Sequence, residues 1–190
     1  MKRGLLVILS GPSGVGKGTV REILMKDKSL NLEYSISMTT RKPRNGEQNG
    51  REYFFTTRDE FEKKIKNGGL LEHAEFVSNY YGTPKDYVDG ELDKGKNVLL
   101  EIETKGAQQV MEKLKGKDVI SIFLLPPSIN DLEKRIKGRK TETEDVIKLR
   151  LSKAYKEIQL KALYDYNVIN DTPEQAAKRI AEIIKGKFIN

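Results

Sequence analysis

The chain has 190 residues, a length that suits one hydrophobic core with a small accessory lobe or lid. Hydrophobic residues make up 37% and charged residues 33%, and no apolar run approaches the roughly 20 residues that span a bilayer, so we expect no membrane partner. The sequence has no cysteine, which excludes disulfides and thiolate metal sites. After the basic start, only about six apolar residues precede Gly11, too few for a signal-peptide core, so we expect a cytoplasmic protein.

The net charge of +7 admits two explanations. A basic surface binds the phosphate backbone of nucleic acids, and a basic cleft holds a ligand with several phosphates. Lysines alternate with acidic residues along the predicted helices, and no block of about five or six like charges occurs. We therefore expect a phosphate-binding cleft and no nucleic-acid partner.

The first elements predict a strand, a glycine-rich turn and a helix. Residues 5–9 are apolar, and Val20, Ile23 and Leu24 have the spacing of one helix face. The turn between them matches the G-x-x-x-x-G-K core of a P-loop, in which backbone N–H groups and a lysine hold phosphates, although Gly18 stands where the strict pattern has Ser or Thr. A turn that only joins the strand to the helix is the alternative. The candidate nucleotide-binding residues are Gly11, Ser13, Gly14, Val15, Gly16, Lys17, Gly18 and Thr19.

Residues from about 34 to 84 predict a small, strand-rich insertion. Apolar and polar residues alternate over residues 34–40, which is the pattern of a half-buried strand. Thr57 and Glu60 have the spacing of a capping box at the start of a helix. The other expected elements are a basic loop over 40–50, a strand over 53–55, an extended segment over 70–77 and a loop over 79–84.

After the insertion, strands and helices alternate, which predicts a parallel sheet with helices on both faces. We expect one α/β domain, a three-layer α/β/α core with a central parallel sheet, a small strand-rich lobe and a helical lid. The core takes about residues 1–33, 85–135 and 155–190, the lobe about 34–84 and the lid about 136–154. The expected elements are helices over 86–94 and around 110–114, strands over 98–102 and 119–125, a helix from 128, a helix over 144–163, a strand at 168–169 and a last helix from 172.

Several polar residues qualify as candidates for chemistry, each with an ordinary alternative. Arg41, Arg44 and Tyr53 suit the grip of a terminal phosphate, or they belong to an exposed basic loop. Glu101 and Glu103 flank Ile102 at a strand end. There they could lie near the water shell of a metal ion or near a substrate amine, and exposure to solvent is the alternative. Glu72 is either a partly buried acceptor or a solvent-facing strand residue.

Three arginines surround a break in the helical pattern near residues 138–143. Arg135, Arg139 and Arg150 are placed as phosphoryl-transfer enzymes place the cations of a closing segment, and surface positions are the alternative. The single histidine, His73, cannot form a metal cluster and is interpreted as structural.

In this order, the motifs resemble the guanylate kinase family of the nucleoside-monophosphate kinase group over about residues 4–188. Gly18 after the lysine is a variant that this group uses. The segments that carry the resemblance are 11–19, Ser37-Met38-Thr39-Thr40-Arg41-Lys42-Pro43-Arg44 with Gly46-Glu47 and Gly50 to Tyr53, Tyr80-Tyr81-Gly82-Thr83, Glu101-Ile102-Glu103 with Gly106, and Arg135 through Gly138-Arg139 to Arg150.

The resemblance implies transfer of the γ-phosphoryl group of ATP to GMP or dGMP, giving ADP and GDP, with Mg²⁺ and within purine nucleotide metabolism. It implies that the GMP phosphate is held by Arg41, Arg44, Tyr53 and Tyr81, and that guanine is recognised by Ser37, Glu72, Thr83 and Glu103. The residues implied to bind ATP are Arg135, Arg139, Arg150 and Asn170. The implied catalytic residues are Lys17, Arg41, Arg139 and Arg150. Thr19 and Glu101 are candidates for contact with Mg²⁺ through water. The family usually has Asp at the position of Glu103.

A non-catalytic module is the alternative function. Guanylate-kinase-like domains in scaffold proteins keep the fold, bind peptides and typically lack an intact P-loop, whereas residues 11–19 are whole here. The sequence leaves the oligomeric state open.

Overall fold

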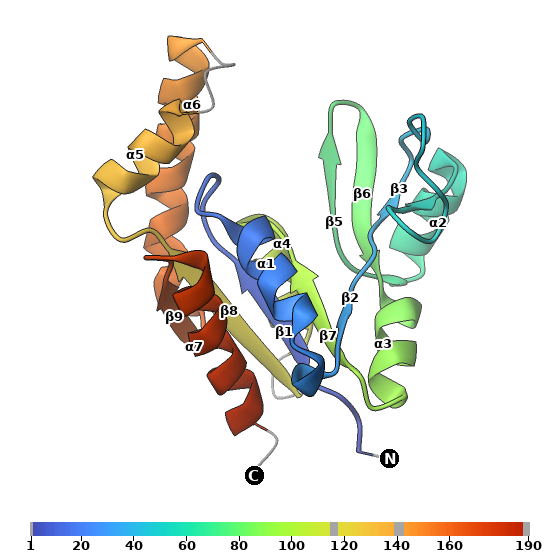
Figure 1. The fold of residues 1–190 in the computed structure, drawn as a ribbon. Helices are drawn as coiled ribbons and strands as arrows, with labels where there is room; N and C mark the ends of the chain where they lie inside the picture. Colours follow the sequence, from blue (N-terminus) through green and yellow to red (C-terminus); the bar gives the residue numbers. More distant parts are fainter. Residues whose placement is uncertain (1, 115–117, 139–142, 188–190) are drawn as a thin grey trace.

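The structure is a computed structural model, and it describes residues 2–114, 118–138 and 143–187. Figure 1 shows a central sheet, a second small sheet to one side, and two helices that rise together on the other side. The strands are β1 Leu6–Ser10, β2 Leu32–Tyr34, β3 Met38–Thr39, β4 Phe54–Phe55, β5 Leu70–Phe76, β6 Asn79–Pro84, β7 Asn97–Glu101, β8 Val119–Leu125 and β9 Tyr166–Ile169. The helices are α1 Lys17–Lys26, α2 Arg58–Lys66, α3 Lys85–Asp93, α4 Thr104–Lys113, α5 Ile129–Lys137, α6 Glu144–Ile158 and α7 Pro173–Gly186, with short 3₁₀ turns at Lys28–Leu30 and Gln159–Leu163.

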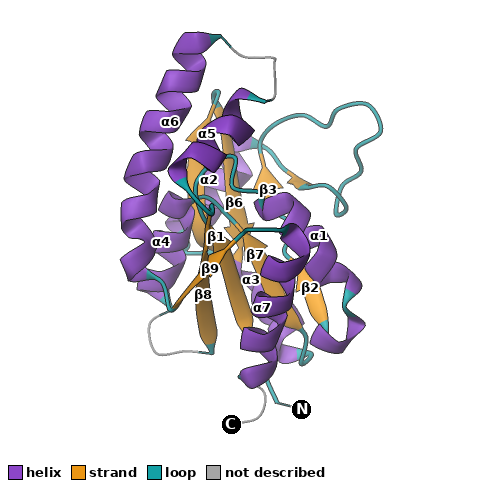
Figure 2. Cartoon of the chain, turned by 60° about the vertical axis from the view of Figure 1, so that its left-hand side comes forward, coloured by secondary structure: helices purple, strands orange, loops and turns teal. Residues whose placement is uncertain are grey.

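The central sheet has the order β2-β7-β1-β8-β9, and every pair in it is parallel. Because side chains alternate across a strand, β1 contributes to two cores. Val7 and Leu9 pack with α1 and α7 on one face, and Leu6 and Ile8 pack with α3 and α4 on the other. Figure 2 shows the sheet between these layers. The predicted three-layer α/β core is confirmed.

The predicted helix starts are confirmed in atomic detail. Thr57 and Glu60 form the reciprocal capping box of α2, Ser128 accepts from the Asp131 N–H at the start of α5, and Thr172 accepts from the Gln175 N–H at the start of α7. These caps satisfy N–H groups that have no partner inside the helix. Residues 139–142, which include Arg139 and part of the predicted lid, lie outside the described residues. No helix within the described ranges is long and apolar enough to cross a membrane.

The small sheet, of order β4-β3-β6-β5, corrects two predictions. The prediction of a single strand over residues 34–40 is wrong in part, because this segment contributes to two strands in different sheets. Its first residue belongs to β2, which pairs with β7 in the central sheet, and residues 38–39 form β3, which pairs with β4 and β6. The loop expected over residues 79–84 is wrong, since this segment is β6 and pairs with β5 in an antiparallel hairpin. Val77 and Ser78 make its turn with φ of 47° and 58°, which is the left-handed region that matches strand twist in tight hairpins.

Candidate active site

A cavity of about 390 Å³ opens at the carboxyl ends of β1 and β7, where ligands bind in open parallel sheets. The P-loop lines one side of this cavity, and the segment that joins β7 to α4 lines another. Gly14 and Gly16 have φ of 84° and 99°, so the loop depends on glycine there. The lining residues are Gly11, Ser13, Gly14, Gly16, Lys17, Gly18, Thr19, Glu101, Ile102, Glu103 and Glu157.

Lys17 is the central cation of this cavity. Its ammonium donates to the carbonyl oxygens of Gly11 and Pro12, at 2.7 and 3.3 Å, so it lies folded within its own loop. Burial lowers the pKa of Lys17, and the negative charges of Glu101 and Glu157 partly offset that effect. A polyphosphate in the cavity would supply the negative charge that a buried ammonium needs.

Asn170 and Arg135 support the loop from behind. The Asn170 amide nitrogen donates to the Val15 carbonyl at 2.8 Å, and Arg135 donates to the same carbonyl at 3.1 Å and to the Asn170 carbonyl at 3.0 Å. Asn170 is 1% exposed, and a Cβ at Gly16 would lie 2.7 Å from its amide nitrogen. In this conformation both residues hold the P-loop backbone, so their expected contacts with ATP stay predictions.

Helix α6 reaches the cavity with three polar residues on one face. Arg150 donates to the Ser13 hydroxyl at 3.0 Å, and Lys153 donates to Glu103 at 3.0 Å. Glu157 accepts from the Ser13 N–H at 3.4 Å. Glu157 was not predicted from the sequence, because it stands in a Lys- and Glu-rich helix that resembles a solvated face and no motif marks it.

Glu101 lines the cavity and could offer a carboxylate oxygen to a cation there. Its Oε2 is buried and has no hydrogen-bond partner, with Arg21 as an ion-pair partner at 3.4 Å. Thr19 is exposed and lines the same cavity. Carboxylate and hydroxyl oxygens are the donors that Mg²⁺ prefers, so these residues fit the expected metal. Within the described chain no group of three or more His, Cys, Asp or Glu side chains forms a metal site by itself.

A buried carboxylate lies on the lobe side of the molecule. Glu72 in β5 is 7% exposed and accepts from the Thr83 hydroxyl of β6 at 2.6 Å. Burial raises the pKa of Glu72, and the Thr83 hydrogen bond opposes that effect. A Cβ at Gly106 in α4 would lie 2.9 Å from Glu72 Oε2, so a larger residue there would push this carboxylate from its position. Of the two alternatives for Glu72, the structure supports the buried acceptor.

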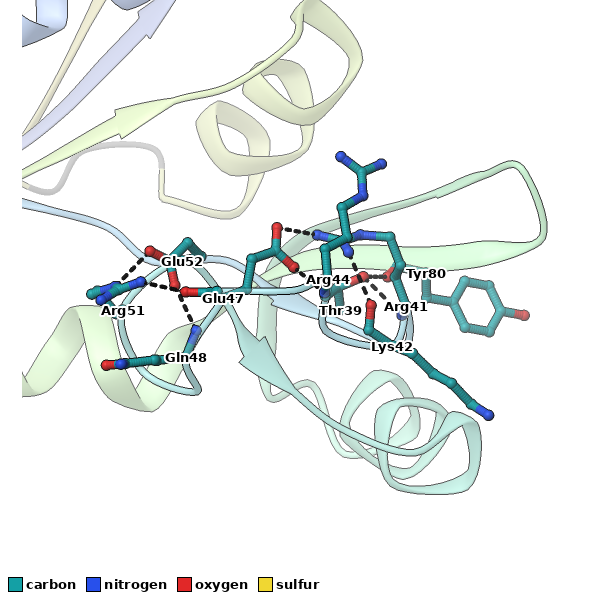
Figure 3. A network of polar contacts seen from close by, with 10 residues as sticks. Thr39, Arg41, Lys42, Arg44, Glu47, Gln48, Arg51, Glu52 and Tyr80 are labelled. Atoms are coloured by element: carbon teal, nitrogen blue, oxygen red, sulfur yellow. Dashed lines mark hydrogen bonds and ion pairs between the residues drawn. The ribbon is translucent and has the colours of Figure 1, made fainter.

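The basic loop between β3 and β4 is organised by Glu47, as Figure 3 shows. Its carboxylate accepts from the Arg41 guanidinium at 2.9 Å and from the Arg44 N–H at 2.8 Å. The Arg41 guanidinium also lies 5.3 Å from the centre of the Tyr53 ring, which in turn meets the Tyr81 ring edge-on at 6.0 Å. The structure therefore gathers the four expected phosphate ligands around one hairpin and one loop. Glu47, which holds Arg41 and the Arg44 backbone, stands in a segment that carries the family resemblance, but no role was predicted for it.

The remaining expected residues are more dispersed. Ser37 is partly exposed and follows β2, where its carbonyl accepts from the Phe54 N–H at 2.9 Å. Glu103 precedes α4 with its side chain 72% exposed, and it lies on the rim of the phosphate cavity. No contact between Glu103 and Glu72 is found in the described ranges, so a shared role in reading a base stays a prediction.

Comparison with known proteins fits this geometry. The family model described as guanylate kinase matches residues 3–187. A guanylate kinase of Lactococcus lactis is 54% identical over 98% of this chain and 89% of its own length. A guanylate kinase of Mesoplasma florum is 55% identical over 96% of this chain, which spans 61% of that longer relative.

A solved structure agrees. The crystal structure of guanylate kinase from Anaplasma phagocytophilum superposes with a TM-score of 0.74 at 35% identity, covering 98% of this chain and 87% of that one. The match runs through the P-loop, the small sheet and the helices that carry the arginines. This chain belongs to the guanylate kinase family.

Proposed function

We propose that this chain transfers the γ-phosphoryl group of ATP to GMP or dGMP and releases ADP and GDP, a step of purine nucleotide metabolism. The observation that carries the proposal is the buried pair of Glu72 and Thr83, which lies in the same molecule as an intact phosphate cradle. The cradle alone would suit many nucleotide-binding proteins. The buried carboxylate adds the choice of acceptor base.

Guanine suits this pair because of its hydrogen-bonding edge. Its N1–H and N2 amino groups are adjacent donors, and one ionised carboxylate accepts from both. Adenine presents an acceptor at N1, so Glu72 would face an unpaired lone pair, and buried polar groups without partners cost roughly 1–3 kcal/mol. Thr83 holds one oxygen of Glu72 in place, and Gly106 leaves room for the other. AMP is therefore rejected at the base.

The acceptor phosphate is held by the residues around Glu47. Arg41 has further N–H donors beyond those used by Glu47, and a guanidinium forks two hydrogen bonds to a phosphate. Tyr53 and Tyr81 lie beside it with hydroxyl groups that suit phosphate oxygens. Arg44 is exposed on the same loop and adds positive charge. Together these residues neutralise the GMP phosphate, which must approach the negatively charged phosphates of ATP.

The donor phosphates occupy the P-loop cavity. Lys17 and the loop N–H groups hold them, and Arg150 lies beside Ser13 at the same loop. Arg139 is proposed to add charge from the lid. No general base is needed, since the second pKa of a phosphate monoester is about 6 and the attacking oxygen is already anionic near neutral pH. Catalysis then depends on alignment and on neutralising the developing charge.

Glu101 and Thr19 would hold Mg²⁺ at this cavity through its water shell. The ion supplies charge neutralisation to the donor phosphates when bound. Arg21 restrains Glu101 through the ion pair at 3.4 Å and lies 4.8 Å from the centre of the Tyr34 ring. We place the reaction in the cytoplasm, where the absence of cysteine is an ordinary composition.

An assay of ADP formation from Mg-ATP with GMP, dGMP, AMP and UMP tests the proposal. We expect saturable turnover with GMP and dGMP, and poor turnover with AMP and UMP. A peptide-binding module without catalysis is not favoured by the relatives, which are named guanylate kinases, and it would show no turnover with any acceptor. Equal rates with AMP and GMP would refute the assignment of Glu72 to the base.

A further inference from the structure

Helix α6 carries a carboxylate for which the reaction proposed above has no use. Glu157 is 6% exposed and lines the cavity that would receive the donor phosphates. A carboxylate there is costly on two counts, since burial removes its hydration and the incoming polyphosphate carries the same sign of charge. Its contacts explain what it contributes.

The two oxygens of Glu157 join α6 to two other elements. Oε1 accepts from the hydroxyl of Thr104, the first residue of α4, at 3.2 Å. Oε2 accepts from the N–H of Ser13 in the P-loop at 3.4 Å. Lys153, one turn earlier on α6, lies 3.7 Å from Glu157 Oε1 and 3.0 Å from Glu103 Oε2, so it offsets the negative charge of both.

Arg150 stands on the same face of α6, two turns before Glu157. Seven residues of α-helix rise about 10 Å and return to nearly the same side. Arg150 donates to the Ser13 hydroxyl at 3.0 Å, while Glu157 accepts from the Ser13 N–H at 3.4 Å. The side chain and the backbone of one P-loop residue are thus both held by α6, and the position of Arg150 depends on how the helix is fixed.

We propose that Glu157 is a positioning residue, which fixes α6 against Ser13 and Thr104 and thereby sets Arg150 at the donor phosphates. This inference rests on the proposed function for the role of Arg150. Because reacting groups tolerate little displacement, a shift of α6 by about 1 Å would lower turnover by about 100-fold. Glu72, Thr83 and the residues proposed to hold the GMP phosphate lie on β3 to β6 and on the loop between β3 and β4, so we expect the KM for GMP to change less than kcat.

A double-mutant cycle between Glu157 and Arg150 tests the proposal. We expect Glu157→Ala to lower kcat by about 10- to 100-fold with the KM for GMP unchanged within about threefold. In an Arg150→Ala background the same change should lower kcat by less than about threefold, because Glu157 acts through Arg150. Effects that multiply in the double variant would overturn the proposal.

The variant Glu157→Gln distinguishes the positioning role of Glu157 from an effect of its charge. In Glu157→Gln the amide oxygen accepts from the Ser13 N–H and the amide nitrogen donates to the Thr104 hydroxyl, so kcat should stay within about threefold of the wild type. A glutamine variant as impaired as the alanine variant would refute positioning and favour a role for the charge. Lys156→Ala, on the exposed side of α6, is the matched control and should match the wild type in kcat and Tm.

Two further measurements keep the test decisive. If Glu157→Ala does not fold, Thr104→Val removes one anchor of Glu157 at nearly constant volume, and it should lower kcat in the same non-additive way with Arg150→Ala. Hydrogen exchange over residues 144–158 should accelerate in Glu157→Ala and not in Lys156→Ala. Unchanged exchange would contradict the anchoring. A wild type without GMP-dependent turnover would refute the proposed function, while exchange still tests the anchor.

Discussion

Glu72→Gln is the substitution that tests the recognition of guanine most sharply. The glutamine has nearly the same shape, so the Thr83 hydroxyl can still donate to its carbonyl oxygen, as it does at 2.6 Å to the carboxylate. The amide nitrogen then faces the guanine donors, and two donors oppose each other. The variant loses one charge-assisted hydrogen bond and leaves a buried donor unpaired, together about 3 kcal/mol.

A loss of 3 kcal/mol corresponds to a factor of about 100 in kcat/KM for GMP. We expect the KM for ATP to change by less than about threefold, because the P-loop cavity is built by other elements. Adenine presents an acceptor and a donor that the amide can match, so the preference for GMP over AMP should also fall. Initial rates of ADP formation over a matrix of GMP, AMP and ATP concentrations measure all three quantities.

Stability provides the control for this variant. Burial raises the pKa of Glu72, so the ionised form costs free energy in the folded state at neutral pH. Replacing it with a neutral amide removes that cost, and the Tm should stay level or rise. An unchanged KM for GMP in a folded Glu72→Gln variant would refute the assignment, and a selective loss of ATP binding would point to a different role.

The remaining predictions concern the same two sites. Gly106→Ala should raise the KM for GMP by about tenfold and lower the Tm, because its Cβ would lie 2.9 Å from Glu72 Oε2; a KM equal to that of the wild type would contradict the close approach. Lys17→Met should lower kcat by at least about 100-fold and leave the melting curve cooperative, and wild-type turnover would exclude the P-loop as the donor site. Acidification from pH 7 to about pH 5 should raise the KM for GMP more in the wild type than in Glu72→Gln. Protonation of Glu72 removes an acceptor oxygen only in the wild type, whereas titration of the GMP phosphate affects both proteins. Parallel pH profiles of the two proteins would argue against an ionised Glu72.

The parts of this fold that are encoded locally could be read from the sequence. The strand that precedes the P-loop is an apolar run that becomes β1, and the Thr57 capping box needs only residues within one turn. Both signals depend on side chains a few positions apart. Prediction therefore succeeded for β1, β7, β8 and β9 of the central sheet and for the starts of α2, α5 and α7.

The errors come from information that lies outside the local pattern. Residues 79–84 contain Asn, Gly and Pro, which favour a loop, but pairing with β5 makes them a strand. The turn before them uses Val77 at φ 47°, a β-branched residue that gives no turn signal. The alternation of apolar and polar residues over 34–40 predicts strand, but it carries no information that the segment is divided between two different sheets.

The same limit applies within the site. Glu157 is buried and accepts hydrogen bonds from Ser13 and Thr104, which are distant in sequence, so its helix has the pattern of a solvated face. Gly106 matters because Glu72 lies opposite it on another element, and no spacing rule relates the two. The residues that carry phosphate chemistry have strong local motifs, whereas those that position them are found only in three dimensions.

The balance of products from GMP and Mg-ATP tests the central claim most directly. With the wild-type chain, chromatography of the reaction should show GDP and ADP rising at a ratio of about one to one, with almost no ADP when GMP is omitted, since a closed site protects ATP from water. ADP that forms at the same rate without GMP, or GDP that does not appear, would contradict phosphoryl transfer to GMP.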